Sequence, residues 1–298
     1  ACLGATALIG FVFTLFFGGV SSAPLVAALT VEGLPLHAVA GLGGWLTFTA
    51  MGVSYRLLAM FMLAPELEGR STKAALWLGA AALTIVIVGG VASIALGYGP
   101  DWAVVTGGLL GLAALALYGR DSARLYRARK RRVIELNSRM AGMALAHLAA
   151  VVLLAIVLVA TGTLGRHVAS LVFLAAFGWL TGLGLAKLYK IVAFLTWLEC
   201  YGPVLGKVDT PRVQDLVVES RAGRWFWLYF AATDFVVLAL LAEAPGLARV
   251  GVAAMLLAVG VIARELLRIR RLADVPQTPR LPQGASRPRL FVSMVPQA

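Results

Sequence analysis

The chain has 298 residues, of which 60% are hydrophobic and only 13% are charged, and its mean hydropathy is +0.89. Soluble domains carry roughly 25% charged residues, so this composition excludes a water-soluble globular protein and predicts an integral membrane protein. The formal net charge is +12. Because the basic residues lie in a few short loops between apolar segments, no nucleic-acid partner is expected.

Long apolar segments predict an all-α fold: a polytopic membrane helix bundle of about eight transmembrane helices in two parallel four-helix repeats. A β-barrel is not expected, because its short strands would alternate polar and apolar residues. In chain order the predicted spans are residues 2–19, 36–63, 74–97, 102–118, 140–161, 165–198, 225–243 and 246–263. Each is near the length of about 20 residues that crosses the hydrocarbon core.

Lys and Arg concentrate in the loops after the second, fourth, sixth and eighth predicted spans. The richest loop, residues 120–139, contains Arg124, Arg127, Arg129, Lys130, Arg131 and Arg132. The positive-inside rule places this loop and both termini in the cytoplasm, and an even number of spans agrees with that placement. A multi-pass protein of the plasma membrane is therefore expected.

One segment of the chain occurs twice. The tetrapeptide Gly-Trp-Leu-Thr stands at residues 44–47 and again at 178–181, and each copy is followed at the same spacing by a Tyr and a basic residue. This repeat predicts a first four-helix unit over residues 1–138, which ends in the basic loop, and a second over 139–272. The duplication encloses a site at a pseudo-symmetry axis or only preserves close helix packing through small residues; both interpretations stay open.

The last predicted segment, residues 273–298, is rich in proline. Pro276, Pro279, Pro282 and Pro288 all fall within it. Such a composition is typical of an extended or disordered tail, so a disordered cytoplasmic tail is expected.

His37 and His167 stand near the starts of the two duplicated spans, on the expected outer side. Imidazoles on neighbouring helices are what bis-histidine haem ligation requires, so these two residues are the candidate cofactor ligands. The alternative is that each is a polar residue at headgroup level where a helix begins. The cofactor expectation is accordingly one b-type haem or none.

His147 and Asp234 are polar residues inside the fifth and seventh predicted spans. These spans run in the same direction, so the two side chains reach similar depth. A carboxylate at that depth is costly, by roughly 2.5–3.5 kcal/mol on insertion scales, and Asp234 is therefore predicted to face the bundle interior and to find a polar partner. A buried His–Asp pair could relay protons or tune a cofactor; a neutral, purely structural Asp234 is the alternative.

Arg56, Lys187 and Lys190 lie at the cytoplasmic ends of the duplicated spans, and Arg56 and Lys190 occupy the same repeat position. They are candidates for contact with lipid phosphates or an anionic ligand. The ordinary alternative is that they extend to the interface to reach water.

Several signals of catalysis are missing from the sequence. It has no Gly-rich phosphate-binding loop, no zinc-ligand spacing and no Ser/His/Asp arrangement, and Cys2 and Cys200 are too few for a metal site or disulfide framework. No catalytic or metal-binding residue is therefore predicted, and a catalytic centre within this chain is not expected.

Residues 36–45 and 52–58, and also residues 187–198, resemble segments of bacterial membrane proteins related to the catalytic subunit of haem–copper oxidases, a group that includes haem proteins of nitric-oxide stress. That family has three four-helix units around a pseudo-threefold axis. The resemblance implies that this chain holds two of the three units, with an absent N-terminal unit as an open question. It also implies a location in the bacterial inner (plasma) membrane, a role in a respiratory or redox chain, and other membrane subunits as partners.

The departures from the family pattern are important. Val39, Ala59 and Ala193, and Glu199 stand where related sequences tend to carry His, Pro and His respectively. Three histidines in all cannot supply a haem–copper centre, so the resemblance implies a non-catalytic or electron-transfer subunit. Two other functions stay open: a proton-coupled secondary transporter or channel, and a structural subunit that binds lipid and a larger membrane complex.

Overall fold

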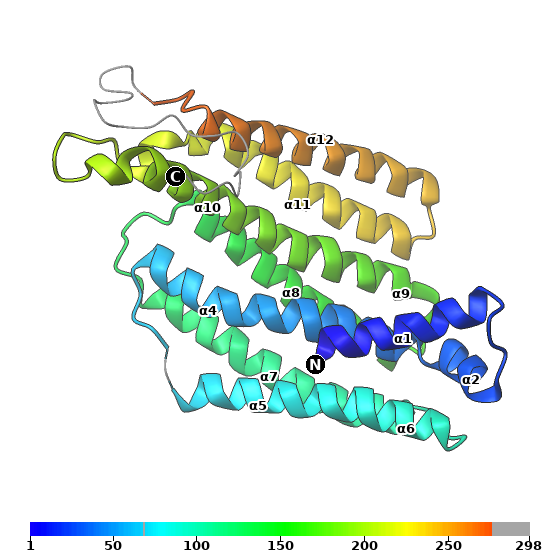
Figure 1. The fold of residues 1–298 in the computed structure, drawn as a ribbon. Coiled ribbons are helices and arrows are strands. Elements are labelled where there is room, and N and C mark those ends of the chain that lie inside the picture. Colours follow the sequence, from blue (N-terminus) through cyan, green and yellow to red (C-terminus); the bar gives the residue numbers. More distant parts are fainter. Residues whose placement is uncertain (68, 276–298) are drawn as a thin grey trace. The chain divides into compact units, whose positions relative to one another are not determined.

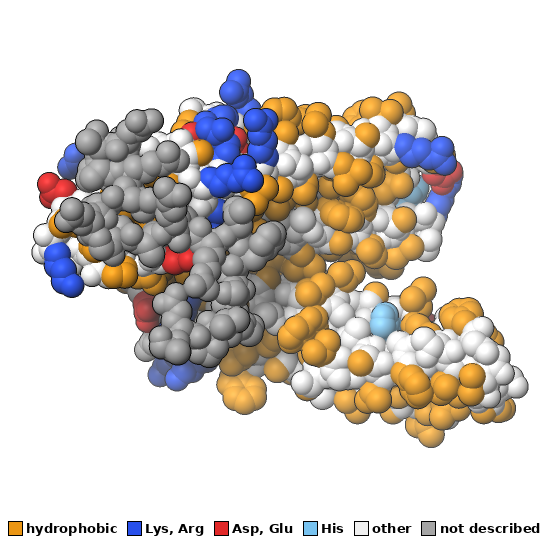
Figure 2. Space-filling model, turned by 45° about the horizontal axis from the view of Figure 1, so that its top comes forward, with side chains coloured by type: hydrophobic (Ala, Val, Ile, Leu, Met, Phe, Trp, Pro, Cys, Tyr) orange, Lys and Arg blue, Asp and Glu red, His pale blue; other side chains and the backbone are white. Residues whose placement is uncertain are grey.

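The computed structural model describes residues 1–67 and 69–275, and within these residues the regular structure is helical, with no strand. Seven helices are long and apolar enough to cross a membrane. Large apolar side chains point outward from several of them, such as Leu109 (64% exposed), Leu153 (63%) and Leu256 (69%). Hydrophobic side chains cover the lengths of the helices, and basic ones gather near their ends (Figure 2). The chain is a polytopic, all-α membrane protein.

The chain divides into two compact units, Ala1–Val133 and Ile134–Ala298. The repeat had predicted a boundary after residue 138. The division instead falls before Glu135, because Glu135 is bound to the second unit by an ion pair with Lys190 and by a hydrogen bond from Gln214.

The described residues of unit 1 form nine helical segments, of which α1, α2 and α4 to α7 are labelled in Figure 1. They are α1 (Cys2–Phe17), α2 (Pro24–Glu32), α3 (Leu34–Ala38), η1 (Val39–Phe48), α4 (Thr49–Met62), α5 (Arg70–Thr84), η2 (Ile85–Gly89), α6 (Gly90–Ala95) and α7 (Asp101–Arg127). The segments α3, η1 and α4 form one continuous span, as do α5, η2 and α6. The first helix packs on η1, and α5 packs along α7.

Unit 2 has four long helices and two short 3-10 turns at one end. Its segments are α8 (Leu136–Ala160), α9 (Leu164–Phe173), η3 (Leu174–Thr181), α10 (Gly182–Tyr201), η4 (Gly202–Val204), η5 (Val213–Leu216), α11 (Glu219–Leu241) and α12 (Pro245–Arg270). The first span, α8, packs on η3 and α10, and α11 packs along α12. The order of packing between spans within unit 2 is thus the same as within unit 1.

The first predicted span differs from the others. Helix α1 has 16 residues, which at 1.5 Å per residue extend about 24 Å, less than the ~30 Å of the hydrocarbon core. A second short helix, α2, follows it after a turn that contains Gly19 at φ +68°. The eight predicted spans therefore correspond to seven long helices and this shorter apolar one.

Both copies of the repeat adopt the same unusual local structure. The first Gly-Trp-Leu-Thr lies in η1 and the second in η3, and both segments are π-helices between α-helical turns. Such insertions are rare and often occur at functional sites. Trp45 is 43% exposed, whereas Trp179 is fully buried, so the two tryptophans do not have the same role within their units.

The repeated glycine has a packing role in both units. A Cβ on Gly44 would lie 2.8 Å from Cys2 Sγ, and one on Gly178 would lie 2.7 Å from His147 Cδ2. Cys2 and His147 both belong to the first helix of their unit. The glycine therefore lets the first and second spans approach closely, which supports the packing interpretation of the repeat.

The end of α12 is held by ion pairs. Asp274 accepts hydrogen bonds of 2.6 Å from both Arg221 and Arg268, and Val275 is buried. The expected tail was to begin at residue 273, but Asp274 is bound by two arginines and Val275 is buried. The rest of that prediction, residues 276–298, lies outside the described residues.

Candidate functional site

The predicted His–Asp pair forms in unit 2. Nε2 of His147, on α8, lies 3.0 Å from Oδ1 of Asp234, on α11. The imidazole is held on three sides: its Nδ1 lies 2.8 Å from the carbonyl oxygen of Met143, its ring stacks at 5.0 Å on Phe230, and its edge faces Gly178. His147 is 5% exposed.

The hydrogen bond to Met143 determines the protonation of the pair. A carbonyl oxygen only accepts, so Nδ1 of His147 must carry a hydrogen. The bond between Nε2 and Asp234 then contains one proton, either as a neutral imidazole with a carboxylic acid or as an imidazolium with a carboxylate. Both forms give the pair zero net charge, which is the state that an apolar environment favours.

Asp234 departs from the expectation of burial. Its side chain is 56% exposed, so the prediction that it faces the bundle interior is wrong, although the predicted polar partner is present. Along α11 it stands ten residues after Arg224 and nine before Glu243, or about 15 Å and about 14 Å from these charged positions. One carboxyl oxygen therefore contacts a buried imidazole, and the group as a whole opens onto the outer face of unit 2 at mid-depth.

His37 lies in unit 1 and is packed by apolar neighbours. Its ring is 5.3 Å from that of Phe13, and a Cβ on Gly10 would lie 3.2 Å from its Cε1. Its Nδ1 is buried and has no hydrogen-bond partner within residues 1–67 and 69–275. His37 lies in the short helix α3 at the start of its span, so both interpretations of this residue stay open.

His167 lies in unit 2, at a kink where its backbone leaves the helical region (φ −114°, ψ 17°). The neighbouring Arg166 donates a hydrogen bond to Glu243, and this bond lowers the pKa of the Glu243 carboxyl. The Nδ1 atom of His167 is also buried with no hydrogen-bond partner in the described part of the chain. The two candidate haem ligands thus share one property, an unbonded ring nitrogen, and belong to different units.

The three basic candidates have different environments. Arg56 is exposed, as lipid or anion contact requires. Lys190 instead forms an ion pair of 2.8 Å with Glu135, and both side chains are nearly buried. Lys187 is only 6% exposed. The structure therefore leaves Arg56 as the one exposed member of this set.

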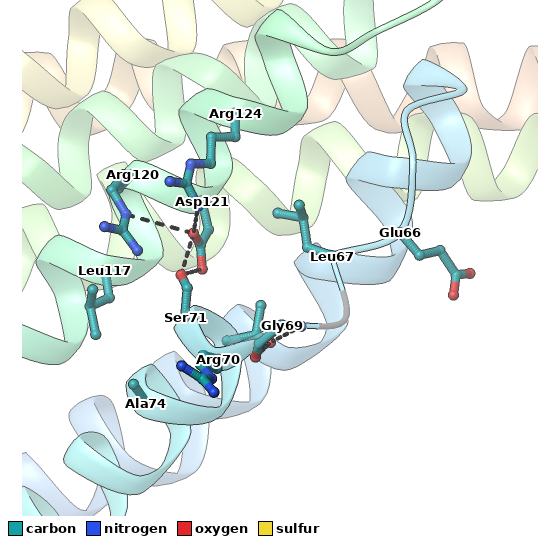
Figure 3. Close-up of a pocket in the computed structure, with 11 residues that line it drawn as sticks. Glu66, Leu67, Gly69, Arg70, Ser71, Ala74, Leu117, Arg120, Asp121 and Arg124 are labelled. Atoms are coloured by element: carbon teal, nitrogen blue, oxygen red, sulfur yellow. Dashed lines mark hydrogen bonds and ion pairs between the residues drawn. The ribbon is translucent and has the colours of Figure 1, made fainter.

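A second polar cluster, in unit 1, was missed by the sequence analysis. Asp121 on α7 is 1% exposed and accepts hydrogen bonds from Ser71 and, at 3.3 Å, from Tyr55. It lies beside a pocket lined by Arg70, Arg120 and Arg124 (Figure 3). The signal was an acidic residue among many basic ones at residues 120–132, but this stretch had been assigned to a loop, whereas α7 continues to Arg127.

Within the described residues, no group of three or more His, Cys, Asp or Glu side chains is placed to hold a metal ion. The most specific arrangement is the His147–Asp234 pair, in which a buried imidazole is hydrogen-bonded to a carboxyl group. Comparisons with protein-family models, with curated proteins and with solved structures found no match to this chain.

Proposed function

We propose that this membrane protein is a proton-coupled secondary transporter or channel, in which the His147–Asp234 pair takes up and releases the proton. The single observation that carries the proposal is the hydrogen bond of 3.0 Å between a buried imidazole and a carboxyl group that is 56% exposed at mid-depth. The exposed part of the Asp234 carboxyl group can exchange a proton with its surroundings, while Oδ1 stays hydrogen-bonded to His147.

The energetics support a transient change of charge. Loss of the shared proton would leave a carboxylate on an apolar surface, which costs roughly 2.5–3.5 kcal/mol at the centre of a span. Gain of a second proton would leave a buried imidazolium. The pair can lose its shared proton or gain a second one only when a substrate, water or another polar group reaches Asp234. Proton release is therefore coupled to the group that contacts the exposed part of Asp234.

The direct test is proton flux into proteoliposomes under an imposed membrane potential. Asp234→Asn keeps the shape of the side chain and its hydrogen bond but cannot release a proton, so flux should fall to the level of empty liposomes. His147→Gln should also lower it. Asp101→Asn is the matched control, because Asp101 is an exposed carboxylate at the first turn of α7. Equal flux through wild type and Asp234→Asn would refute the proposal.

A second candidate, the redox-linked subunit, is supported by one observation. His37 and His167 each keep a buried ring nitrogen without a hydrogen bond in the described part of the chain, and an imidazole nitrogen is the usual axial ligand of a b-type haem. When bound, haem would supply one-electron transfer, and a link to a respiratory chain would follow. A reduced-minus-oxidised spectrum tests this: a haem band that is lost in His37→Ala or in His167→Ala, and kept in His147→Gln, supports it.

A further inference from the structure

Unit 1 contains a pocket of about 550 Å³ at the end that carries the basic loop. Its described lining comes from Glu66, Leu67 and Gly69, from the first turn of α5 and from the last turns of α7 (Figure 3). Three arginines line it: Arg70 from the start of α5, and Arg120 and Arg124, one turn apart on α7. The pocket therefore collects guanidinium groups from two helices.

Among the described residues of the pocket, one buried carboxylate pairs with two of the arginines. Buried Asp121 lies 3.9 Å from Nε of Arg120 and 3.6 Å from Nη1 of Arg124, and the two arginine side chains are 51% and 53% exposed. In Figure 3 the carboxylate of Glu66 points away from them. Each guanidinium has five N–H donors, so one fixed carboxylate orients both groups and leaves donors open to a further anion.

Two further cavities with mostly apolar linings follow this pocket along the same helices, and we call this series of cavities the groove because neighbouring cavities share lining residues. The second cavity, of about 250 Å³, shares Thr72 with the arginine pocket. The third cavity, of about 230 Å³, shares Phe48 and Met51 with the second. The third extends to Val86. From Thr72 to Val86 is 14 residues, about 21 Å along a helix, which exceeds the ~15 Å depth of one leaflet of a ~30 Å hydrocarbon core.

Along the membrane normal, the arginine pocket and the apolar groove follow one another in the same order as the headgroup and the acyl chains of a lipid. The apolar part of α7 ends at Leu117 and Tyr118, and Arg120 follows within one turn. The arginine pocket thus stands where the spans leave the hydrocarbon, at the level of lipid phosphates, and the groove runs from it into the hydrocarbon. Arginine is well suited to phosphate, because its planar donors bind two oxygens at once.

We propose that unit 1 binds one anionic phospholipid, with its phosphate held by Arg70, Arg120 and Arg124 and one acyl chain in the groove beyond Thr72. The headgroup chemistry alone would also fit free inorganic phosphate. The groove favours the lipid, because only a lipid joins a phosphate to an apolar chain of that length. This site is independent of the His147–Asp234 pair, which lies in unit 2.

Native mass spectrometry of the full chain in detergent can test the site, with phosphatidylglycerol and phosphatidylcholine of the same acyl chains as probes. We expect the wild type to retain phosphatidylglycerol in preference to phosphatidylcholine. The double variant Arg120→Gln/Arg124→Gln should weaken that binding by roughly thirtyfold, since each basic group near the surface contributes about a fivefold factor. The matched control is Arg127→Gln/Arg129→Gln, whose residues are exposed and do not line the pocket.

The groove is tested separately by Gly52→Leu. Gly52 lines the second cavity, and a Cβ built there meets no atom within 4 Å, so the new side chain fills the groove without disturbing the backbone. It should weaken phosphatidylglycerol binding, whereas Gly4→Leu, at an equally open position on α1, should not.

Two results would overturn the proposal. The first is equal lipid retention by wild type and the Arg120→Gln/Arg124→Gln variant. The second is a combination of two observations: inorganic phosphate binds in a way that depends on these arginines, and Gly52→Leu leaves lipid retention unchanged. The pocket would then be a site for free phosphate. Thermal unfolding of each variant in detergent shows whether a loss of binding reflects a loss of fold.

Discussion

The imidazole of His147 packs directly on Gly178, where a Cβ would lie 2.7 Å from the ring carbon Cδ2. A glycine of the repeat therefore positions the residue that bonds to Asp234. In unit 1 the corresponding Gly44 faces Cys2 instead. The two glycines have the same packing role, and the residue on the first helix of each unit decides whether the glycine faces a thiol or an imidazole.

Replacement of Gly178 by alanine should disrupt the pair without removing either of its members. The added methyl would push His147 away from Asp234, so proton flux should fall at least tenfold and the free energy of unfolding should fall by about 1–3 kcal/mol. Proteoliposome flux and unfolding in detergent measure the two effects. Gly184→Ala, where a Cβ meets no atom within 4 Å, is the control. Unchanged flux in Gly178→Ala would show that proton flux does not depend on the geometry of the His147–Asp234 pair.

Two adjacent glycines of α7 should respond in opposite ways to alanine. A Cβ on Gly107 would lie 2.3 Å from Val86 Cγ2 and 2.8 Å from the carbonyl oxygen of Ala82, so Gly107→Ala should destabilise unit 1 by about 1–3 kcal/mol. A Cβ on Gly108 meets nothing within 4 Å, so Gly108→Ala should be neutral or slightly stabilising. Equal unfolding free energies of the two variants would contradict the close packing of α5 and α7.

The ion pair between Lys190 and Glu135 should stabilise unit 2. The two side chains are 12% and 10% exposed, and removal of one member of a buried pair costs about 3–5 kcal/mol because the other charge keeps its desolvation cost. Lys190→Met should therefore lower the unfolding free energy by about 3 kcal/mol, and Lys190→Met/Glu135→Met should recover part of the loss. Arg56→Met is the control at the same repeat position, and should change stability by less than about 0.5 kcal/mol.

Asp274 should make stability depend on acid pH. Hydrogen bonds from Arg221 and Arg268 lower the pKa of this carboxyl below its ordinary value of 3.8. Since the folded pKa is the lower one, the stabilisation is fully present above the ordinary pKa and is lost as the pH falls below it towards the folded pKa. Asp274→Asn should lower the free energy of unfolding by about 2 kcal/mol at neutral pH. The difference in unfolding free energy between wild type and variant, here called the gap, should narrow as the pH falls below about 4. Unfolding curves recorded across this range measure the gap; a gap that stays constant with pH would exclude the ion-pair origin.

The distribution of basic residues favours a cytoplasmic position for the loop after α7, and this orientation stays a proposal. In a background of Cys2→Ala and Cys200→Ala, a cysteine at the exposed position Lys130 should react with a membrane-impermeant thiol reagent only from the cytoplasmic side. A cysteine at Gly99, in the turn before α7, should react only from the other side. The reverse pattern would invert the topology.

The sequence predicted the helical membrane fold well because its signals are local. Hydrophobic length identifies a span within about 20 residues of sequence, so the long helices were identified from composition alone. Helix ends were less certain: α7 extends to Arg127 through residues that had been assigned to a loop, because its charged last turns lie beyond the apolar segment.

The sequence by itself determined that this is a helical membrane protein with a duplicated segment, and it identified His147 and Asp234 as partners, because a polar group in hydrocarbon must find another. Only the tertiary structure decided that Asp234 is half exposed, that Lys190 binds Glu135, and that Arg70 meets Arg120 and Arg124 at one pocket. The physical reason is that burial and pairing depend on which faces of different helices meet. Helix rotation about its own axis is set by packing contacts far apart in the chain, and the hydropathy of a span does not encode it.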